Sequence, residues 1–319
     1  MEAYRFTEAG TRHQRQGAGN QDALRVEHHG PHCLAFLSDG MGSAGLGAMA
    51  ADIAVGVGLD MAKRAFVPQP EVDDESGLLA VRTAFSSAYN AIQNAARDGR
   101  DLNSLLATFM AVYHNERTGC LHFGYCGDGG IITLGDDGAV RLAAVPHKGQ
   151  TAFQTTSLLD FSAWTFGSVE RVRAWAMMTD GLFDALCPAG SLPVGDQREE
   201  ALASLLEAPR HMDDPRMRPY LDASFSPSAP SPDDFGALFD AVADDRSIIV
   251  VRGSDAAFSE RVASGALFPD AFSRDDETLL ETLPPDDVVR VRMVIEARKG
   301  ARCRFAWHGR VKEENYAHV

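Results

Sequence analysis

The sequence predicts an α+β protein: an antiparallel β-sandwich flanked by helices, followed by a small C-terminal extension. Three observations support this fold class. Short apolar runs open the chain, two long helical stretches follow, and a series of runs with alternating polarity comes after the helices. Strands and helices do not alternate as a parallel sheet requires, so helices packed on antiparallel sheets fit better.

The composition is that of a globular protein, with 45% hydrophobic and 24% charged residues among 319. The formal net charge of -15 argues against binding to nucleic acid or anionic lipid and favours a bound cation. No apolar run approaches the roughly 18 residues of a membrane span, and the N-terminus shows no secretory signal pattern. We therefore expect a cytoplasmic protein that binds neither nucleic acid nor membrane. The composition does not indicate an oligomeric state.

The N-terminal part is expected to hold three strands and two helices. Short apolar runs predict strands over residues 4–8, 23–28 and 33–38. Residues 44–66 are rich in alanine and free of proline, which predicts a buried helix. Residues 76–97 carry apolar side chains at three- and four-residue spacing, which predicts a helix with one apolar face.

The central part is expected to be an antiparallel meander. Four runs with period-two alternation (TFMAVYHN, CLHFGYC, GIITL and AVRLAAV) are separated by turn-forming residues. Another strand, VRAWAMMTD, ends at Asp180 and leads into a short helix. Residues 188–232 are rich in proline, aspartate and serine, which predicts a loop or lid insertion.

The last predicted strand should complete a domain that spans residues 1–253. Ser231-Pro232 is typical of a helix start, and the helix should reach Ala243, just before the buried run RSIIVVR. Residues 254–319 are expected to form a helical segment and a β-hairpin of unknown role. In that hairpin residues 288–297 would pair with residues 301–311.

Acidic residues fall at the ends of the predicted strands. Asp22 precedes a strand, Asp39 and Asp180 each end an apolar strand and precede a glycine, and Asp244 begins the last strand. Carboxylates at strand ends can converge at one edge of a sheet, where they repel one another unless divalent cations lie between them. Oxygen ligands suit Mg²⁺ or Mn²⁺. A single Asp-Gly pair, in contrast, is more often a turn than a ligand.

The residues around these carboxylates resemble the metal-dependent protein phosphatase 2C (PPM) family of serine/threonine phosphatases. Similar segments occur in the family's order between residues 5 and 252, and the opening AGTRHQRQGAGNQDA is closer to the bacterial branch. The matching segments are Asn20–Ala23, Ser38–Gly42, Ala107–Phe109, Gly127–Gly129, Met178–Asp184 and Asp244–Ser247.

The resemblance implies hydrolysis of phosphate monoesters by a water that two Mn²⁺ or Mg²⁺ ions activate. Asp39 would bridge both ions and the carbonyl of Gly40 would complete one site, while Asp180 and Asp244 would hold the other ion. Asp22 would be a ligand or an acceptor that orients metal-bound water. The substrate would be a phosphoprotein, the target of a serine/threonine kinase.

Two further roles stay open on the resemblance. Asp128 would help to hold a third ion, or it is a plain turn residue. Gly17 stands where the family commonly has an arginine, which leaves Arg12, His13 or Arg15 to meet the phosphate. We assign catalytic roles to Arg12 and His13, and His13 is also a candidate general acid.

Two other functions compete with this interpretation. Residues 40–45, GMGSAG, fit the GxGxxG pattern of dinucleotide-binding proteins, but Asp39 directly before the first glycine would repel a pyrophosphate. The second is a catalytically silent phosphatase-like module that binds phosphoproteins or scaffolds a signalling partner. The four retained carboxylates favour activity, because without cations they repel one another at a cost.

Overall fold

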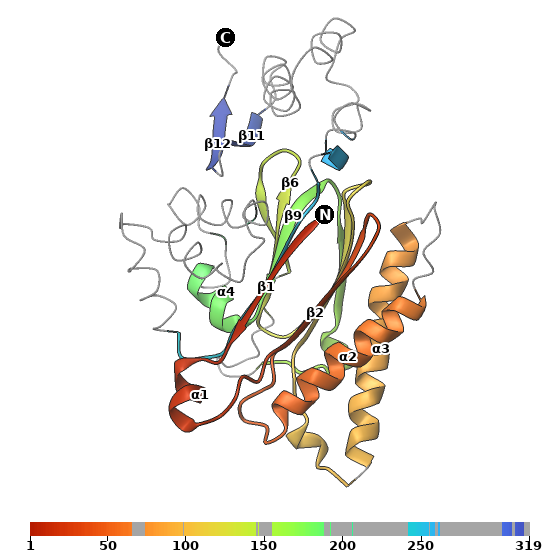
Figure 1. The fold of residues 1–319 in the computed structure, drawn as a ribbon, viewed down its shortest axis with the longest axis vertical. Coiled ribbons are helices and arrows are strands. Elements are labelled where there is room, and N and C mark those ends of the chain that lie inside the picture. The colour runs from red at the N-terminus through yellow and green to blue at the C-terminus, as the bar shows by residue number, and fades with distance from the viewer. Residues whose placement is uncertain are drawn as a thin grey trace, which may run out of the picture.

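A computed structural model gives the fold of the chain. It describes residues 1–65, 74–97, 99–144, 146, 155–187, 192, 206, 242–254, 256–258 and 261, and the backbone of residues 302–307 and 310–315. Two five-stranded antiparallel sheets form a sandwich, with helices outside it (Figure 1). The predicted fold class is confirmed.

The first sheet joins the beginning of the chain to residues near 250. Its strands, in spatial order, are β1 (Glu2–Glu8), β10 (Arg246–Arg252), β9 (Val172–Met178), β6 (Gly130–Gly135) and β7 (Val140–Ala144). β1 pairs with β10 along its whole length, from Glu2 opposite Arg252 to Glu8 opposite Arg246. The loops that precede β2 and β10 are thereby brought to the same end of the sandwich.

The second sheet is built from two hairpins and a later strand. Its order is β2 (Ala23–His29), β3 (His32–Ser38), β4 (Phe109–Asn115), β5 (Cys120–Cys126) and β8 (Thr165–Val169). Side chains that alternate along both sheets fill the space between them, among them Leu37, Met110, Trp175, Met177 and Ile249. This inner core fixes how the strand ends of one sheet face those of the other.

Helices cover the outer faces of both sheets. α2 (Gly47–Ala65) and α3 (Asp74–Arg97) pack side by side on the second sheet, and α4 (Asp180–Leu186) lies against the first (Figure 1). The buried side of α2 and α3 is rich in alanine, which lets each helix approach the sheet closely. Both helices agree with the predicted ones to within about three residues.

The predicted meander is wrong in one respect. β4 pairs with β5 and β6 pairs with β7, but β5 and β6 belong to different sheets. Residues 127–129 therefore carry the chain across the sandwich and do not form a hairpin turn. Every residue of β5 and β6 is buried, so polarity alone could not assign either strand to a sheet.

Two elements were not expected from the sequence. α1 (Thr11–Gln16) has no apolar stripe. Gly10, directly before it, and Arg12, within it, instead form hydrogen bonds to residues 243–245. β8 pairs with β5 although its own residues are mostly half-buried. Both elements depend on contacts distant in the sequence, which local patterns do not reveal.

The C-terminal hairpin is shifted from the predicted one. β11 (Arg302–Trp307) pairs with β12 (Arg310–Asn315), which begins inside the predicted second strand; residues 288–297, the predicted first strand, lie outside the described residues. The predicted insertion at 188–232 and the helix from Ser231 lie almost wholly outside the described residues. Within the described part of the chain, no helix has the length and apolar character needed to cross a bilayer.

Candidate functional site: three carboxylates between the sheets

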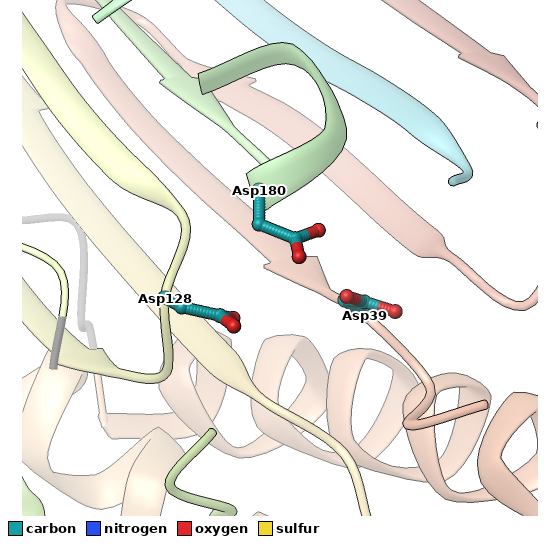
Figure 2. A group of neighbouring side chains, drawn as sticks. All are labelled: Asp39, Asp128 and Asp180. Atoms are coloured by element: carbon teal, nitrogen blue, oxygen red, sulfur yellow. The ribbon is translucent and has the colours of Figure 1, made fainter. Parts of the chain in front are cut away.

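Three carboxylates meet at one end of the sandwich. Oxygen atoms of Asp39, Asp128 and Asp180 all lie within 4.8 Å of one another (Figure 2). Asp39 follows β3 in the second sheet, Asp180 begins α4 directly after β9 in the first sheet, and Asp128 lies on the crossing from β5 to β6. Both sheets therefore contribute to this group, which we call the acidic triad.

The glycine after each strand-end aspartate allows another segment to approach. A Cβ atom on Gly40 would lie 2.4 Å from the backbone of Gly47, at the start of α2. A Cβ on Gly181 would lie 2.2 Å from the carbonyl oxygen of Asp245. Neither glycine has a positive φ, so these Asp-Gly pairs are close-packing positions and not turns.

The backbone of Asp39 is fixed by residues next to β4. Its N–H donates to the hydroxyl of Thr108 at 2.9 Å, and its carbonyl accepts from the N–H of Thr108 at 2.9 Å. The N–H of Gly40 donates to the carbonyl of Gln21 at 3.2 Å. These bonds hold the end of β3 in place through its backbone, so that the carboxylate of Asp39 remains near those of Asp128 and Asp180.

Asp22 lies next to the triad. Its Oδ2 accepts a hydrogen bond from the hydroxyl of Thr179 at 3.0 Å, and its buried Oδ1 has no hydrogen-bond partner among the described residues. Burial, and after it the charge of the neighbouring Asp22, raise the pKa of Asp39. Ionisation of both carboxyl groups is therefore disfavoured when no cation is present.

Burial and mutual repulsion disfavour ionisation of these groups. Loss of hydration raises the pKa of Asp180 to about 9, and the charges of Asp39, Asp128 and Asp244 add to the rise. Burial raises the pKa of Asp22 to about 7 against opposing hydrogen bonds. The pKa of Asp39 is raised well above its usual range, first by burial and then by the neighbouring carboxylates. At neutral pH the group cannot be fully ionised without compensating positive charge.

The donor set fits a hard divalent cation. All the side-chain donors are carboxylate oxygens, and the buried Oδ1 of Asp180, like that of Asp22, has no hydrogen-bond partner within the described part of the chain. A cation would satisfy these atoms and relieve the repulsion. Thr155 donates a hydrogen bond to Asp128 Oδ2, which orients the third carboxylate of the triad.

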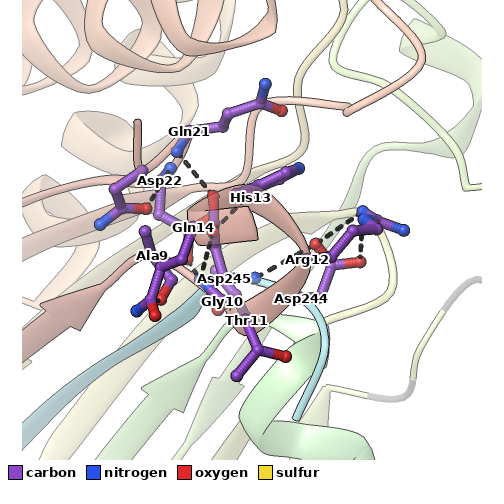
Figure 3. Close-up of polar contacts among 12 residues, drawn as sticks. Ala9, Gly10, Thr11, Arg12, His13, Gln14, Gln21, Asp22, Asp244 and Asp245 are labelled. Atoms are coloured by element: carbon purple, nitrogen blue, oxygen red, sulfur yellow. Dashed lines mark hydrogen bonds and ion pairs between the residues drawn. The ribbon is translucent and has the colours of Figure 1, made fainter. Parts of the chain in front are cut away.

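Asp244 lies near the triad but outside it. Its charge contributes to the raised pKa values of Asp39 and Asp180, so it faces the same space. Both of its oxygens lie 3.0 Å from Nη2 of Arg12, which reaches it from α1 (Figure 3). In this structure, therefore, an arginine supplies the cationic partner of Asp244.

Asp245 is a buried residue that the sequence analysis did not select. Its exposed fraction is 2%, compared with 37% for the side chain of Asp244. Oδ1 accepts from the N–H of Gly10 at 2.7 Å and lies 2.8 Å from Nδ1 of His13, and Oδ2 accepts from the N–H of Gln21 at 2.6 Å (Figure 3). The only sequence signal was a second aspartate directly before a buried strand.

The family assignment rests on the sequence as a whole. The family model described as Protein phosphatase 2C matches residues 9–222, more than half of the chain. The chain belongs to the protein phosphatase 2C family. A search of curated proteins finds no match.

Solved structures of protein phosphatases share the fold. A bacterial serine phosphatase is 15% identical, with a TM-score of 0.53 over 80% of this chain and 98% of its own. The catalytic domain of the serine/threonine phosphatase PstP, in complex with 2 manganese ions, is 18% identical, with a TM-score of 0.51 over 78% and 96%. PppA, a regulatory component of T6SS in Pseudomonas aeruginosa, is 14% identical, with a TM-score of 0.52 over 79% and 97%.

Proposed function

We propose that this protein is a cation-dependent phosphatase that hydrolyses phosphoserine and phosphothreonine in a protein substrate. The observation that carries the proposal is the acidic triad, in which carboxylates from both sheets meet within 4.8 Å and resist ionisation. The phosphatase 2C family and the manganese complex of PstP support it. A substrate modified by a serine/threonine kinase in the cytoplasm fits this activity.

The proposed ligands are the residues that the resemblance to the phosphatase 2C family indicated. Asp39 would contribute to the sites of two Mn²⁺ or Mg²⁺ ions, the carbonyl of Gly40 would complete one site, and Asp180 and Asp244 would hold the other ion. Asp22 would serve as a ligand or orient water, and Asp128 would serve a third ion. When bound, such ions supply positive charge for the phosphoryl oxygens and lower the pKa of a water molecule. Asp244 can join them only when Arg12 moves off its carboxylate.

Helix α1 supplies the basic groups of the proposed site. Arg12 lies 3.0 Å from Asp244, and the buried His13 is held by Asp245. An arginine beside a carboxylate that binds a cation is well placed to exchange that carboxylate for a phosphate, because guanidinium groups bind both. We therefore assign phosphate contact to Arg12 and His13.

The activity can be tested with two substrates. Purified protein should hydrolyse p-nitrophenyl phosphate and a phosphoserine peptide when Mn²⁺ is present, and chelator should abolish both reactions. Activity that survives chelator would contradict a cation-dependent mechanism. Hydrolysis of the aryl phosphate but not of the phosphoserine peptide would contradict the proposal that the substrate is a phosphoprotein.

The pairing of Arg12 with Asp244 favours a second candidate function. With a proposed ligand already paired to an arginine, the fold would serve as a silent module that binds phosphoproteins or scaffolds a partner. Calorimetry with the same phosphoserine peptide separates the two: the silent module would bind it without turnover at any Mn²⁺ concentration.

A further inference from the structure

The buried carboxylate of Asp245 holds the segment that carries His13. It accepts hydrogen bonds from the backbone N–H groups of Gly10 and Gln21, on either side of α1, at 2.7 and 2.6 Å. The same Oδ1 that accepts from Gly10 lies 2.8 Å from Nδ1 of His13. One side chain therefore fixes both the position of α1 and the ring that α1 presents (Figure 3).

These bonds determine the tautomer of His13. Backbone N–H groups can only donate, so both oxygens of Asp245 act as acceptors. Nδ1 of His13 must then donate to Oδ1, which leaves Nε2 as the nitrogen that is available to a ligand. The His13 side chain is 6% exposed, so packing also limits its rotation.

Nε2 of His13 faces a position shared by two other polar groups. A side chain on Gly42 would begin 3.6 Å from His13 Nε2, 3.5 Å from Arg12 Nη2 and 3.6 Å from Gln21 Oε1. The side-chain oxygen of Gln21 is buried and has no hydrogen-bond partner among the described residues. Gly42 is exposed, so the position is open to solvent. We call it the open position at Gly42.

This position lies beside the acidic triad. Gly42 follows Asp39 by three residues, and Gln21 precedes Asp22 and accepts a hydrogen bond from Gly40 through its carbonyl. A guanidinium and an imidazole beside one open point match the oxygens of a phosphoryl group, because both can donate hydrogen bonds to them. A side chain larger than glycine at residue 42 would occupy that point.

We propose that Asp245 is a positioning residue, which orients His13 so that Nε2 contacts a phosphoryl oxygen of a phosphate monoester at the open position at Gly42. Arg12 completes the contact. Nε2 donates to that oxygen when the ring carries its second proton. This inference rests on the proposed function, since it assigns the phosphate contact within that site.

A double-mutant cycle tests whether Asp245 acts through His13. We expect His13→Gln to lower kcat/KM for a phosphoserine peptide about 10- to 100-fold, the range for one lost charge-assisted hydrogen bond. Asp245→Asn should lower kcat/KM by a similar factor. The asparagine amide would direct its own N–H groups towards one of the three groups that donate to Asp245 in the wild type. The double variant should lose no more than His13→Gln alone. Losses that multiply would overturn the proposal.

Asp136→Asn is the matched control. Asp136 has the same exposed fraction, 2%, and accepts from Arg261, but it lies on the β6–β7 connection outside the proposed site. It should lower thermal stability while leaving kcat/KM of the folded protein unchanged. An equal loss of kcat/KM in Asp136→Asn and Asp245→Asn would show that Asp245 is merely structural.

A spectroscopic measurement keeps the inference testable without turnover. In ¹⁵N NMR of the Mg²⁺-loaded protein, with His13→Gln as the assignment control, His13 should show a protonated Nδ1, and its Nε2 resonance should shift when inorganic phosphate is added. An Nδ1 without a proton, or an Nε2 that ignores phosphate, would overturn the proposal. Absence of wild-type turnover with these signals present would refute the proposed function and leave the positioning role standing.

Discussion

At the scale of single residues, the acidic triad is unfavourable for the folded protein when no cation is bound. Three partly buried carboxylates and Asp22 lie close together, and the pKa values of Asp39, Asp180 and Asp22 are raised. Natural folds keep such unfavourable groups where they serve a function. The consequences can be measured separately on activity, on stability and on cation affinity.

Removing one charge from the triad should abolish catalysis. We expect Asp39→Asn and Asp180→Asn each to lower kcat with Mn²⁺ by several orders of magnitude, because each variant loses a proposed cation ligand. Steady-state kinetics on p-nitrophenyl phosphate measures the effect. Asp52→Asn, on an exposed position of α2, is the control and should keep full activity. More than about a tenth of wild-type turnover in both triad variants would contradict the assignment.

The same carboxylates should make metal-free stability depend on pH. The folded protein keeps a proton on Asp180 up to about pH 9, and one on Asp22 up to about pH 7, whereas the unfolded chain releases both near pH 4. The folded state therefore binds more protons in this window, and its stability falls as pH rises from 4 to 9. Thermal unfolding in chelator should show this slope.

Asp180→Asn provides the comparison for that slope. The variant should unfold at a higher temperature than the wild type at pH 8 in chelator, and its dependence on pH should be weaker, because the repelled charge is gone. Asp52→Asn should keep the wild-type slope. Parallel curves for the wild type and Asp180→Asn would refute the raised pKa of Asp180.

Arg12 should compete with cations for Asp244. Arg12→Ala frees both oxygens of Asp244, so half-maximal activity should need several-fold less Mn²⁺, while KM for a phosphopeptide should rise. Arg15→Ala, on the same helix, should change neither value. Titration of Mn²⁺ at fixed substrate gives the first value. Identical behaviour of the two variants would remove Arg12 from the site.

At the scale of elements, the crossing between β5 and β6 is where a structural role and a proposed functional role coincide. Gly127 has a φ of 135°, and a Cβ there would lie 2.6 Å from the side chain of Thr108. Only glycine tolerates that conformation and that approach. The crossing therefore places Asp128 beside Asp39 by backbone geometry that a hairpin turn would not provide.

Asp128 should tune cation affinity without being essential. Asp128→Ala should raise the Mn²⁺ concentration for half-maximal activity while keeping the tighter ions bound, because a third, weaker ligand set is lost. Isothermal titration counts the ions, and kinetics gives the midpoint. Asp137→Ala, in the β6–β7 turn, is the control. An unchanged midpoint in Asp128→Ala would leave Asp128 without a role in cation binding.

Elements with strong local patterns could be predicted, and those defined by distant contacts could not. The apolar spacing of α3 and the alternation of β4 and β5 gave nearly correct bounds. Sheet membership of β6 could not be read, since both of its faces are buried. α1 has six residues and is held by the backbone of Ala243 and the side chains of Asp244 and Asp245, which no local pattern encodes.

At the scale of the whole molecule, residues after the last strand are tied to the sandwich. The sequence predicted that a separate segment starts at residue 254. In the structure, the N–H of Ser254 donates to the carboxylate of Glu116 at 2.9 Å. The buried Arg261 pairs with Asp136 at 2.6 Å and stacks near Phe258. These contacts lie at the β6–β7 and β4–β5 connections, so Ser254, Phe258 and Arg261 contribute to the packing of the domain.

Breaking this tie should destabilise the protein. Arg261→Ala leaves the carboxylate of Asp136 buried without its arginine, which costs about 3–5 kcal/mol in free energy of unfolding. Arg141→Ala removes the exposed pair with the neighbouring Asp137 and should cost less than about 1 kcal/mol. Denaturant unfolding compares the two variants. Equal and small losses would place the domain boundary at residue 253, as predicted from the sequence.

The site could be predicted in outline because its carboxylates stand at strand ends, and several such ends converge in an antiparallel sandwich. Their partners could not be predicted. The arginine on Asp244 and the histidine on Asp245 come from a helix more than 230 residues away in the chain. Which of two adjacent aspartates is buried depends on how β10 docks beside α1.

The geometry of the acidic triad also depends on how the two sheets are aligned. Asp39 moves with one sheet, Asp180 with the other, and Asp128 with the crossing that joins them. A rotation or slide of one sheet against the other would therefore change the spacing of the three oxygens. Selection on the site therefore extends to the side chains packed between the sheets, at positions that never touch a substrate.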